Sequence, residues 1–268
     1  MKRRHFLTIA GLTPALALLT TFARAEDAAD SIAVIKARGK LLAGVKMDTP
    51  PFGFLNEANE PAGFDLDILR AVAATIGVPI EFVRVTSVTR IPLLLSGNVD
   101  LVAASMTHTR EREHAIDFSE DYYVGGQTLL VPKASTITGV DGLDGKRVAV
   151  QQGTTLAKNI ATLAPKANVT AFRDYDAAWL ALAQGRADAL TGSLSILEGF
   201  AKNNDGFKIV GGLLSKEPFG VGMRHGDWAM RDAVNGTLQD LWTSGAYAKL
   251  YQTWFGGEPP EPIEVYPQ

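Results

Sequence analysis

LSGNVDLVAAS, residues 95–105, decides the fold, because it recurs as AQGRADALTGS at residues 183–193. The two copies align Gly97 with Gly185 and Ser105 with Ser193. In each copy a glycine ends a helical pattern, a short apolar strand follows, and a serine comes just past the strand. Ligands of open α/β sheets bind outside the carboxyl ends of the strands. The repeat therefore predicts two similar lobes with these serines on opposite walls of one cleft, and the alternative is a chance match.

The flanking sequence extends this pattern in both directions. Helical patterns at 31–38, 64–76 and 90–95 alternate with strand patterns at 41–46, 80–85 and 100–104. The same order returns with strands at 147–150, 169–172 and 188–191 and helices at 154–163 and 175–183. Asp65 is a plausible N-cap of the second helix. This alternation predicts an α/β protein in which each lobe is a central sheet flanked by helices.

Two extended apolar segments are the expected connections between the lobes. Residues 122–132 contain Gly125-Gly126, and residues 216–223 resemble them in character. Two helices at 228–242 and 245–254 and a proline-rich tail at 259–268 complete the chain. We predict one lobe from 26–124 and 218–268 and a second from 125–217, joined by two hinge strands.

The N-terminal segment 1–25 has the features of an export signal. Three basic residues precede an apolar run that ends in Ala23-Arg24-Ala25. Arg3-Arg4 before Phe6-Leu7 resembles a twin-arginine signal, and an ordinary secretion signal is the alternative. Loss of the segment's four basic residues would change the net charge from −3 to −7. We therefore expect a periplasmic protein that does not bind nucleic acid.

The composition excludes several kinds of site. The chain has no cysteine, which rules out disulfides, cysteine metal sites and a lipidated cysteine anchor. No nucleotide-binding glycine motif is present, and the four histidines are scattered. We expect no cofactor and no metal.

The candidate binding residues lie at strand ends. Ser105, Thr107 and Arg112 follow a buried strand, and arginine suits bidentate contact with a carboxylate. Thr154 and Thr155 open a helix, whose free N–H groups attract anions; simple N-capping is the alternative. Two cations at strand ends, Lys46 and Arg90, are more often surface charges when taken alone. Phe52 is either a ligand contact or a core residue.

These residues resemble the polar amino-acid-binding proteins of bacterial ABC importers, solute-binding protein family 3, over nearly the whole chain after residue 25. The resemblance is carried by Pro51-Phe52, by residues 63–67, by residues 100–107 together with Arg112, by Asp117-Phe118-Ser119 and by residues 143–155. It implies the two-lobe type II periplasmic binding protein fold, a monomer that closes over its ligand, and a membrane permease as partner.

The resemblance also implies roles for individual residues. Arg112 would clamp the ligand's α-carboxylate, and the segment around Arg90 resembles the glutamate/aspartate branch, in which Arg90 and Lys46 would hold a side-chain carboxylate. Where relatives that bind basic amino acids have aromatic residues, this chain has Thr49 and Ser87. The family's aspartate for the ammonium group falls at Ser193, so Asp48 or Glu198 would have to replace it, or the ligand lacks an ammonium group. The expected binding residues are Lys46, Asp48, Phe52, Ser87, Arg90, Ser105, Met106, Thr107, Arg112, Thr154, Thr155 and Ser193.

Three functions remain open at this point. The first is binding of a polar, acidic amino acid. The second is binding of a dicarboxylate or another organic acid without an α-ammonium group. The third is a cyclohexadienyl dehydratase-like enzyme, which would need an acid/base group in the cleft; the sequence offers no clear candidate, and we expect no enzyme.

Overall fold

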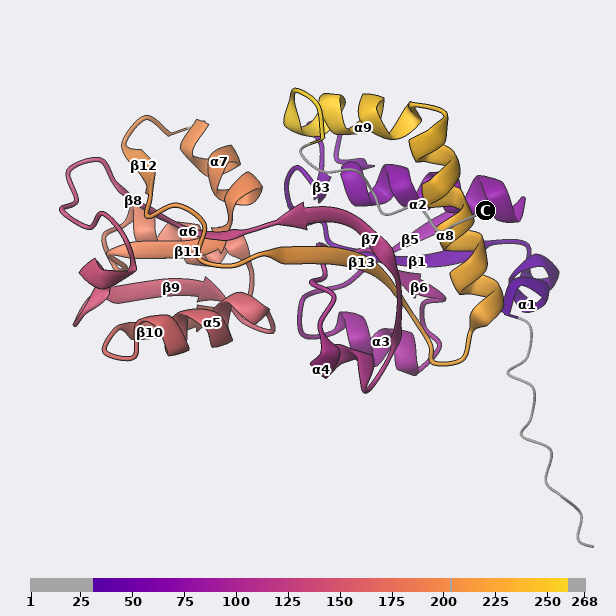
Figure 1. The fold of residues 1–268 in the computed structure, drawn as a ribbon, viewed down its shortest axis with the longest axis horizontal. Helices are drawn as coiled ribbons and strands as arrows, with labels where there is room; N and C mark the ends of the chain where they lie inside the picture. The colour runs from indigo at the N-terminus through magenta and orange to yellow at the C-terminus, as the bar shows by residue number, and fades with distance from the viewer. Residues whose placement is uncertain (1–30, 203, 260–268) are drawn as a thin grey trace, which may run out of the picture.

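The computed structural model describes residues 31–202 and 204–259, which form two lobes side by side (Figure 1). The predicted export signal at 1–25 and most of the proline-rich tail lie outside these ranges. Each lobe is built on a five-stranded sheet.

The first lobe has strand order β5-β1-β6-β13-β7. These are β5 (Ile80–Arg84), β1 (Leu41–Val45), β6 (Leu101–Val102), β13 (Glu217–Met223) and β7 (Asp117–Gly125). Strand β1 pairs in parallel with β5 and β6, and β13 pairs antiparallel with β6 and β7. A small sheet of β2 (Asp48–Thr49), β3 (Gly53–Leu55) and β4 (Pro61–Ala62) is added.

Helices cover both faces of this first sheet. One core packs α1 (Ser31–Arg38), α2 (Phe64–Ile76), α8 (Trp228–Thr243) and α9 (Ala246–Phe255) against it. The other packs α3 (Arg90–Leu95), with the short α4 (Arg110–Glu113) on the same side (Figure 1).

The second lobe repeats this plan. Its strand order is β10-β9-β11-β8-β12. The strands are β10 (Asn168–Phe172), β9 (Arg147–Gln151), β11 (Ala189–Ser193), β8 (Gln127–Pro132) and β12 (Phe207–Val210). One face carries α5 (Thr155–Leu163) and η1 (Val140–Leu143), and the other carries α6 (Tyr175–Ala183) and α7 (Leu194–Lys202).

The chain crosses between the lobes twice. The first crossing joins β7 to β8 at Gly126, and the second joins β12 to β13 through residues 211–216. An added Cβ on Gly126 would lie 2.8 Å from the carbonyl oxygen of Ser215, so the two crossings approach each other closely. The residue at which each predicted lobe begins and ends stays a prediction.

The internal repeat has the same local structure in both lobes. Gly97 and Gly185 adopt left-handed conformations, with φ of 74° and 68°, which glycine tolerates. The carboxylate of Asp100 accepts a hydrogen bond from the backbone N of Leu42 at 2.8 Å. Asp188 does the same for Arg147 at 2.8 Å. Each aspartate thus ties the turn after a helix to the start of the neighbouring parallel strand, β1 in the first lobe and β9 in the second.

Asp65 has a different role from the predicted N-cap. The N-cap of α2 is Gly63, and no side chain caps this helix. Asp65 is fully buried and accepts hydrogen bonds from the backbone N of Ser105 at 2.7 Å and from Tyr122 Oη at 2.8 Å. Burial raises the pKa of this carboxyl to about 6, and the two hydrogen bonds oppose the rise. Asp65 therefore fixes Ser105, whose φ of 41° is unusual for a residue with a Cβ.

Candidate functional site

A closed cavity lies where the carboxyl ends of the strands of both lobes meet. Its volume is about 20 Å³, room for roughly one water molecule between the closed lobes. Its lining contains many of the predicted binding residues: Lys46, Arg90, Ser105, Thr107, Thr154, Thr155 and Ser193. Five further residues complete the lining: Leu156, Tyr175, Ile196, Glu217 and Phe219. The sequence repeat thus pointed to the right edge of each sheet.

The first lobe contributes cations and hydroxyls. Lys46 follows β1, and Arg90 is the first residue of α3; each is only 2% exposed. Arg90 Nη1 donates to the carbonyl of Ala104 at 2.7 Å, while its Nε has no partner. The Oγ of Ser105, after β6, is also buried without a partner.

The second lobe contributes the start of a helix and a strand end. Thr154 and Thr155 lie at the N-terminus of α5, where the backbone N–H groups are free of intrahelical bonds. Ser193 ends β11, is 3% exposed, and its Oγ has no partner. A buried hydroxyl without a partner loses free energy unless a ligand or water bonds to it.

Direct contacts close the cavity between the lobes. Lys46 Nζ donates to Gln151 Oε1 at 2.9 Å, and the hydroxyls of Thr107 and Thr155 are 3.2 Å apart. On the outer rim, Lys158 of α5 bonds Glu111 of α4 at 2.7 Å. The structure is therefore a closed conformation.

The electrostatic field of the cavity is positive. Burial and, to a smaller extent, the charge of Arg90 lower the pKa of Lys46 to about 7, while Asp48 and Asp65 act in the opposite direction. Burial likewise lowers the pKa of Arg90 to about 9, with a smaller effect from Arg112. Glu217 is the single carboxylate among the described lining residues. The arrangement suits a ligand that brings negative charge.

Two predicted binding residues belong to the core instead. Phe52 is fully buried among the rings of Tyr123, Phe219 and Phe255, with centroids 4.9–5.3 Å away. Met106 is fully buried in the core beneath α3. The apolar side chains of Phe52 and Met106 are packed in these cores and do not line the closed cavity, and a role for either residue in ligand binding stays a prediction.

Three other predicted residues lie beside the cavity rather than in its lining. Ser87 is bonded to Gln151 Oε1 at 3.3 Å, and Asp48 accepts from Thr49 Oγ1 at 3.0 Å. The guanidinium of Arg112 donates to the carbonyls of Thr107 at 2.5 Å and Gly153 at 3.4 Å, which belong to different lobes. These three surround the lining and position it.

Sequence reasoning missed several residues at the site. Tyr175 begins α6, and its ring centroid lies 5.7 Å from Lys46 Nζ. Gln151 was part of the quoted motif without a role of its own. Glu217 begins β13, directly after the second crossing, and a single buried carboxylate at a strand start gives no spacing signal in sequence.

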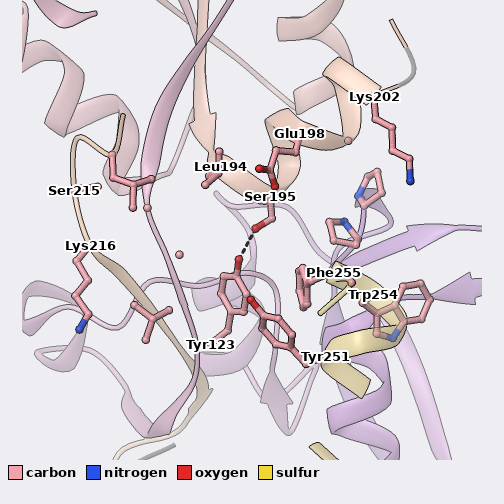
Figure 2. A pocket seen from close by; sticks show the side chains of 18 of the residues that line it. Tyr123, Leu194, Ser195, Glu198, Lys202, Ser215, Lys216, Tyr251, Trp254 and Phe255 are labelled. Atoms are coloured by element: carbon pink, nitrogen blue, oxygen red, sulfur yellow. Dashed lines mark hydrogen bonds between the residues drawn. The ribbon is translucent and has the colours of Figure 1, made fainter. Parts of the chain in front are cut away.

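A second, larger pocket lies at the hinge, and Glu198 lines it (Figure 2). Its walls come from both crossings, from α7 and from α9, including Tyr123, Ser195, Tyr251 and Phe255. The hydroxyls of Tyr123 and Ser195 are hydrogen-bonded across it (Figure 2). Glu198 is thus absent from the lining of the central cavity, which argues against it as partner of a ligand's ammonium group.

The described residues show neither a membrane-spanning helix nor a cluster of metal ligands. No helix in ranges 31–202 and 204–259 is long and apolar enough to cross a membrane. The same part of the chain holds no group of three or more residues suited to bind a metal ion.

Comparison with known proteins settles the family. Residues 41–257 match the bacterial extracellular solute-binding proteins, family 3. The chain belongs to this family. The glutamine-binding protein GlnH of Bacillus subtilis is 38% identical over 88% of both chains. The L-glutamate/L-aspartate-binding protein of Pseudomonas aeruginosa is 31% identical, covering 89% of this solute-binding protein and 84% of the relative.

A solved structure shows the same fold. A mutant of the arginine-binding protein ArgBP from T. maritima superposes with a TM-score of 0.81 at 35% identity, covering 85% of this solute-binding protein and 100% of that chain. The predicted two-lobe type II periplasmic binding protein fold is confirmed, as is the family resemblance.

Proposed function

We propose that this solute-binding protein serves an ABC importer in the periplasm and binds an amino acid with an acidic side chain. Relatives named for glutamine and for glutamate or aspartate support the amino-acid class. The observation that favours an acidic side chain on the ligand is that two buried cations, Lys46 and Arg90, line the same cavity.

The two cations favour a carboxylate over an amide. Burial lowers the pKa of both side chains, and the positive charge of Arg90 also lowers the pKa of Lys46. The two oxygens of a ligand carboxylate would accept hydrogen bonds from both cations and so replace the water that each has lost. A neutral amide offers a single carbonyl oxygen to the two cations. Hydrogen bonds to charged groups contribute about 1.5–3 kcal/mol, against about 0.5–1.5 kcal/mol for neutral pairs.

The α-carboxylate of the ligand fits the opposite side of the cavity. Thr154 and Thr155 place the N-terminus of α5 in the lining, and unpaired N–H groups with a positive dipole end attract carboxylates. Arg112 lies beside them, and its role as a clamp is part of this proposal.

Calorimetry with L-glutamate, L-aspartate, L-glutamine, L-arginine and glutarate tests the proposal. We expect the best acidic amino acid to bind about tenfold more tightly than L-glutamine, as the difference between charged and neutral hydrogen bonds implies. Tighter binding of L-glutamine would contradict the acidic side chain and leave the amino-acid class intact.

The neutral Ser193 favours a second candidate, an organic acid without an α-ammonium group. Tighter binding of glutarate than of L-glutamate would support it. Turnover of prephenate or arogenate would instead revive the enzyme alternative. We further propose a membrane permease as partner and a monomer in solution.

A further inference from the structure

Glu217 is a buried carboxylate in the central cavity that no sequence pattern predicted. It is the first residue of β13, pairs with Gly125 of β7, and is 3% exposed. It lies at the second crossing and lines the central cavity together with residues of both lobes. An ionised carboxylate at such a depth needs compensating donors.

Three donors hold this carboxylate in a fixed orientation. Oε1 accepts from Asn159 Nδ2 at 2.9 Å and from Ser215 Oγ at 2.7 Å. Oε2 accepts from Thr155 Oγ1 at 2.7 Å. A carboxylate has about four acceptor positions, so Oε2 can take one more donor. Thr155 also lines the cavity, which puts Oε2 on the side where a ligand would lie.

Ser193 lies close to Glu217 across Gly125. A Cβ added to Gly125 would be 3.2 Å from Ser193 Oγ and 3.6 Å from the backbone oxygen of Glu217. The Oγ of Ser193 is buried and has no partner. Ser193 Oγ and the Glu217 carboxylate therefore both belong to the lining of a cavity whose other charged lining groups are cations, and Gly125 lies between Ser193 Oγ and the backbone of Glu217.

We propose that Glu217 supplies the negative charge for the ligand's α-ammonium group, with Ser193 Oγ as a second acceptor. This inference rests on the proposed function, because it requires an amino acid as ligand. An ammonium donates three hydrogen bonds and needs an anion when desolvated. The side-chain carboxylate of the ligand then lies against Lys46 and Arg90, which accounts for a cavity that holds both signs of charge.

The test compares Glu217→Gln with the natural protein by calorimetry, using L-glutamate and glutarate. Glutarate has the same two carboxylates and lacks the amino group. Removing one partner of a buried charge pair should weaken L-glutamate binding about 30-fold or more. Glutarate binding should change less than about threefold, because its recognition does not involve Glu217. Equal losses for both ligands, or no loss, would overturn the inference.

Two further variants separate charge from structure. Glu198→Gln removes a carboxylate from the hinge pocket outside the cavity and should leave the preference for L-glutamate over glutarate unchanged. Ser193→Asp in the Glu217→Gln background should restore that preference, because it returns a carboxylate to the lining of the cavity. A fold defect would lower the thermal midpoint and would not be rescued in this way.

The outcomes also separate this inference from the proposed function. If the natural protein binds glutarate more tightly than any amino acid, both fail. If it binds L-glutamate and Glu217→Gln retains the preference, the inference alone fails. If it binds L-glutamine rather than L-glutamate, only the acidic side chain is contradicted, and Glu217→Gln is compared on L-glutamine and its analogue without the α-amino group.

Discussion

In the proposed function, Lys46 is one of the two cations that recognise the side-chain carboxylate of the ligand. We expect Lys46→Met to weaken binding of L-glutamate about 10- to 100-fold, because one cation facing the side-chain carboxylate is lost. Binding of L-glutamine should weaken by less than about threefold. Methionine has a similar length and keeps the buried stem packed. Calorimetry with both ligands measures the two losses of affinity. A similar loss for both would show that Lys46 stabilises the closed conformation and does not recognise the charge of the ligand.

Titration of Lys46 makes binding depend on pH. With a pKa of about 7, lowered by burial and by Arg90, Lys46 is charged below pH 7 and largely neutral above it. A ligand carboxylate raises this pKa again, so binding above pH 7 takes up a proton and weakens by up to about tenfold per pH unit. The charged groups that act on Lys46 are Arg90, Asp48, Asp65 and Arg112.

Calorimetry at pH 8 in buffers of different ionisation enthalpy measures this uptake. The natural protein should take up a proton with L-glutamate, and Lys46→Met should not. Equal proton uptake by both proteins would assign the effect to another group.

At the scale of elements, sequence periodicity was informative where one helix face is buried. The helix predicted at 64–76 has these bounds in the structure, because its apolar side is entirely covered. The helix α7 was not predicted, although Leu194, Leu197 and Phe200 have helical spacing, because it follows β11 directly and no turn residue marks its start. The small strands β2 to β4 have two or three residues each, too short for any period to appear.

The site was predictable only in part, for a physical reason. Strand ends locate Lys46, Ser105 and Ser193, since the parallel sheet rule places them at one edge. Glu217 and Tyr175 come to the cavity through packing of one lobe on the other, which no local pattern encodes. Phe52 and Met106 fit the family motif yet fill cores.

Helices α4 and α5 form an outer contact between the lobes, which gives an element-scale prediction. Glu111 and Lys158 are both exposed and lie 2.7 Å apart. Glu111→Lys should weaken binding of every ligand by a similar small factor at low salt, because like charges oppose closure. The effect should disappear near 1 M salt, where screening is strong. Calorimetry at two salt concentrations measures it.

The swapped pair, Glu111→Lys with Lys158→Glu, is the matched control. It should return the affinity to that of the natural protein, because the attraction is restored with reversed polarity. A loss that persists in the swapped pair would show that the contact does not contribute through charge.

We expect the whole molecule to open before it binds a ligand, because its cavity in the closed conformation has room for roughly one water molecule. The lining side chains of Lys46, Arg90 and Ser193 are 2–3% exposed, and hydrogen bonds between the lobes seal them. Only the two crossings connect the lobes along the chain, and both pass close together at Gly126 (Figure 1). We expect a hinge at this point, and its opening would separate Tyr175 and Ile196 of the second lobe from the core that they share with the first lobe.

We therefore expect the radius of gyration measured by small-angle scattering to fall when a saturating amino acid is added. The free protein samples open forms, and ligand contacts made by both lobes favour the closed one. The control is Glu217→Gln with L-glutamate at a concentration below the variant's raised dissociation constant. This sample should keep the larger radius of gyration. If calorimetry shows saturation and the radius of the natural protein does not change, the lobes are already closed in the free state. Access to the cavity would then require local opening at the rim, between α4 and α5, rather than movement of one lobe against the other.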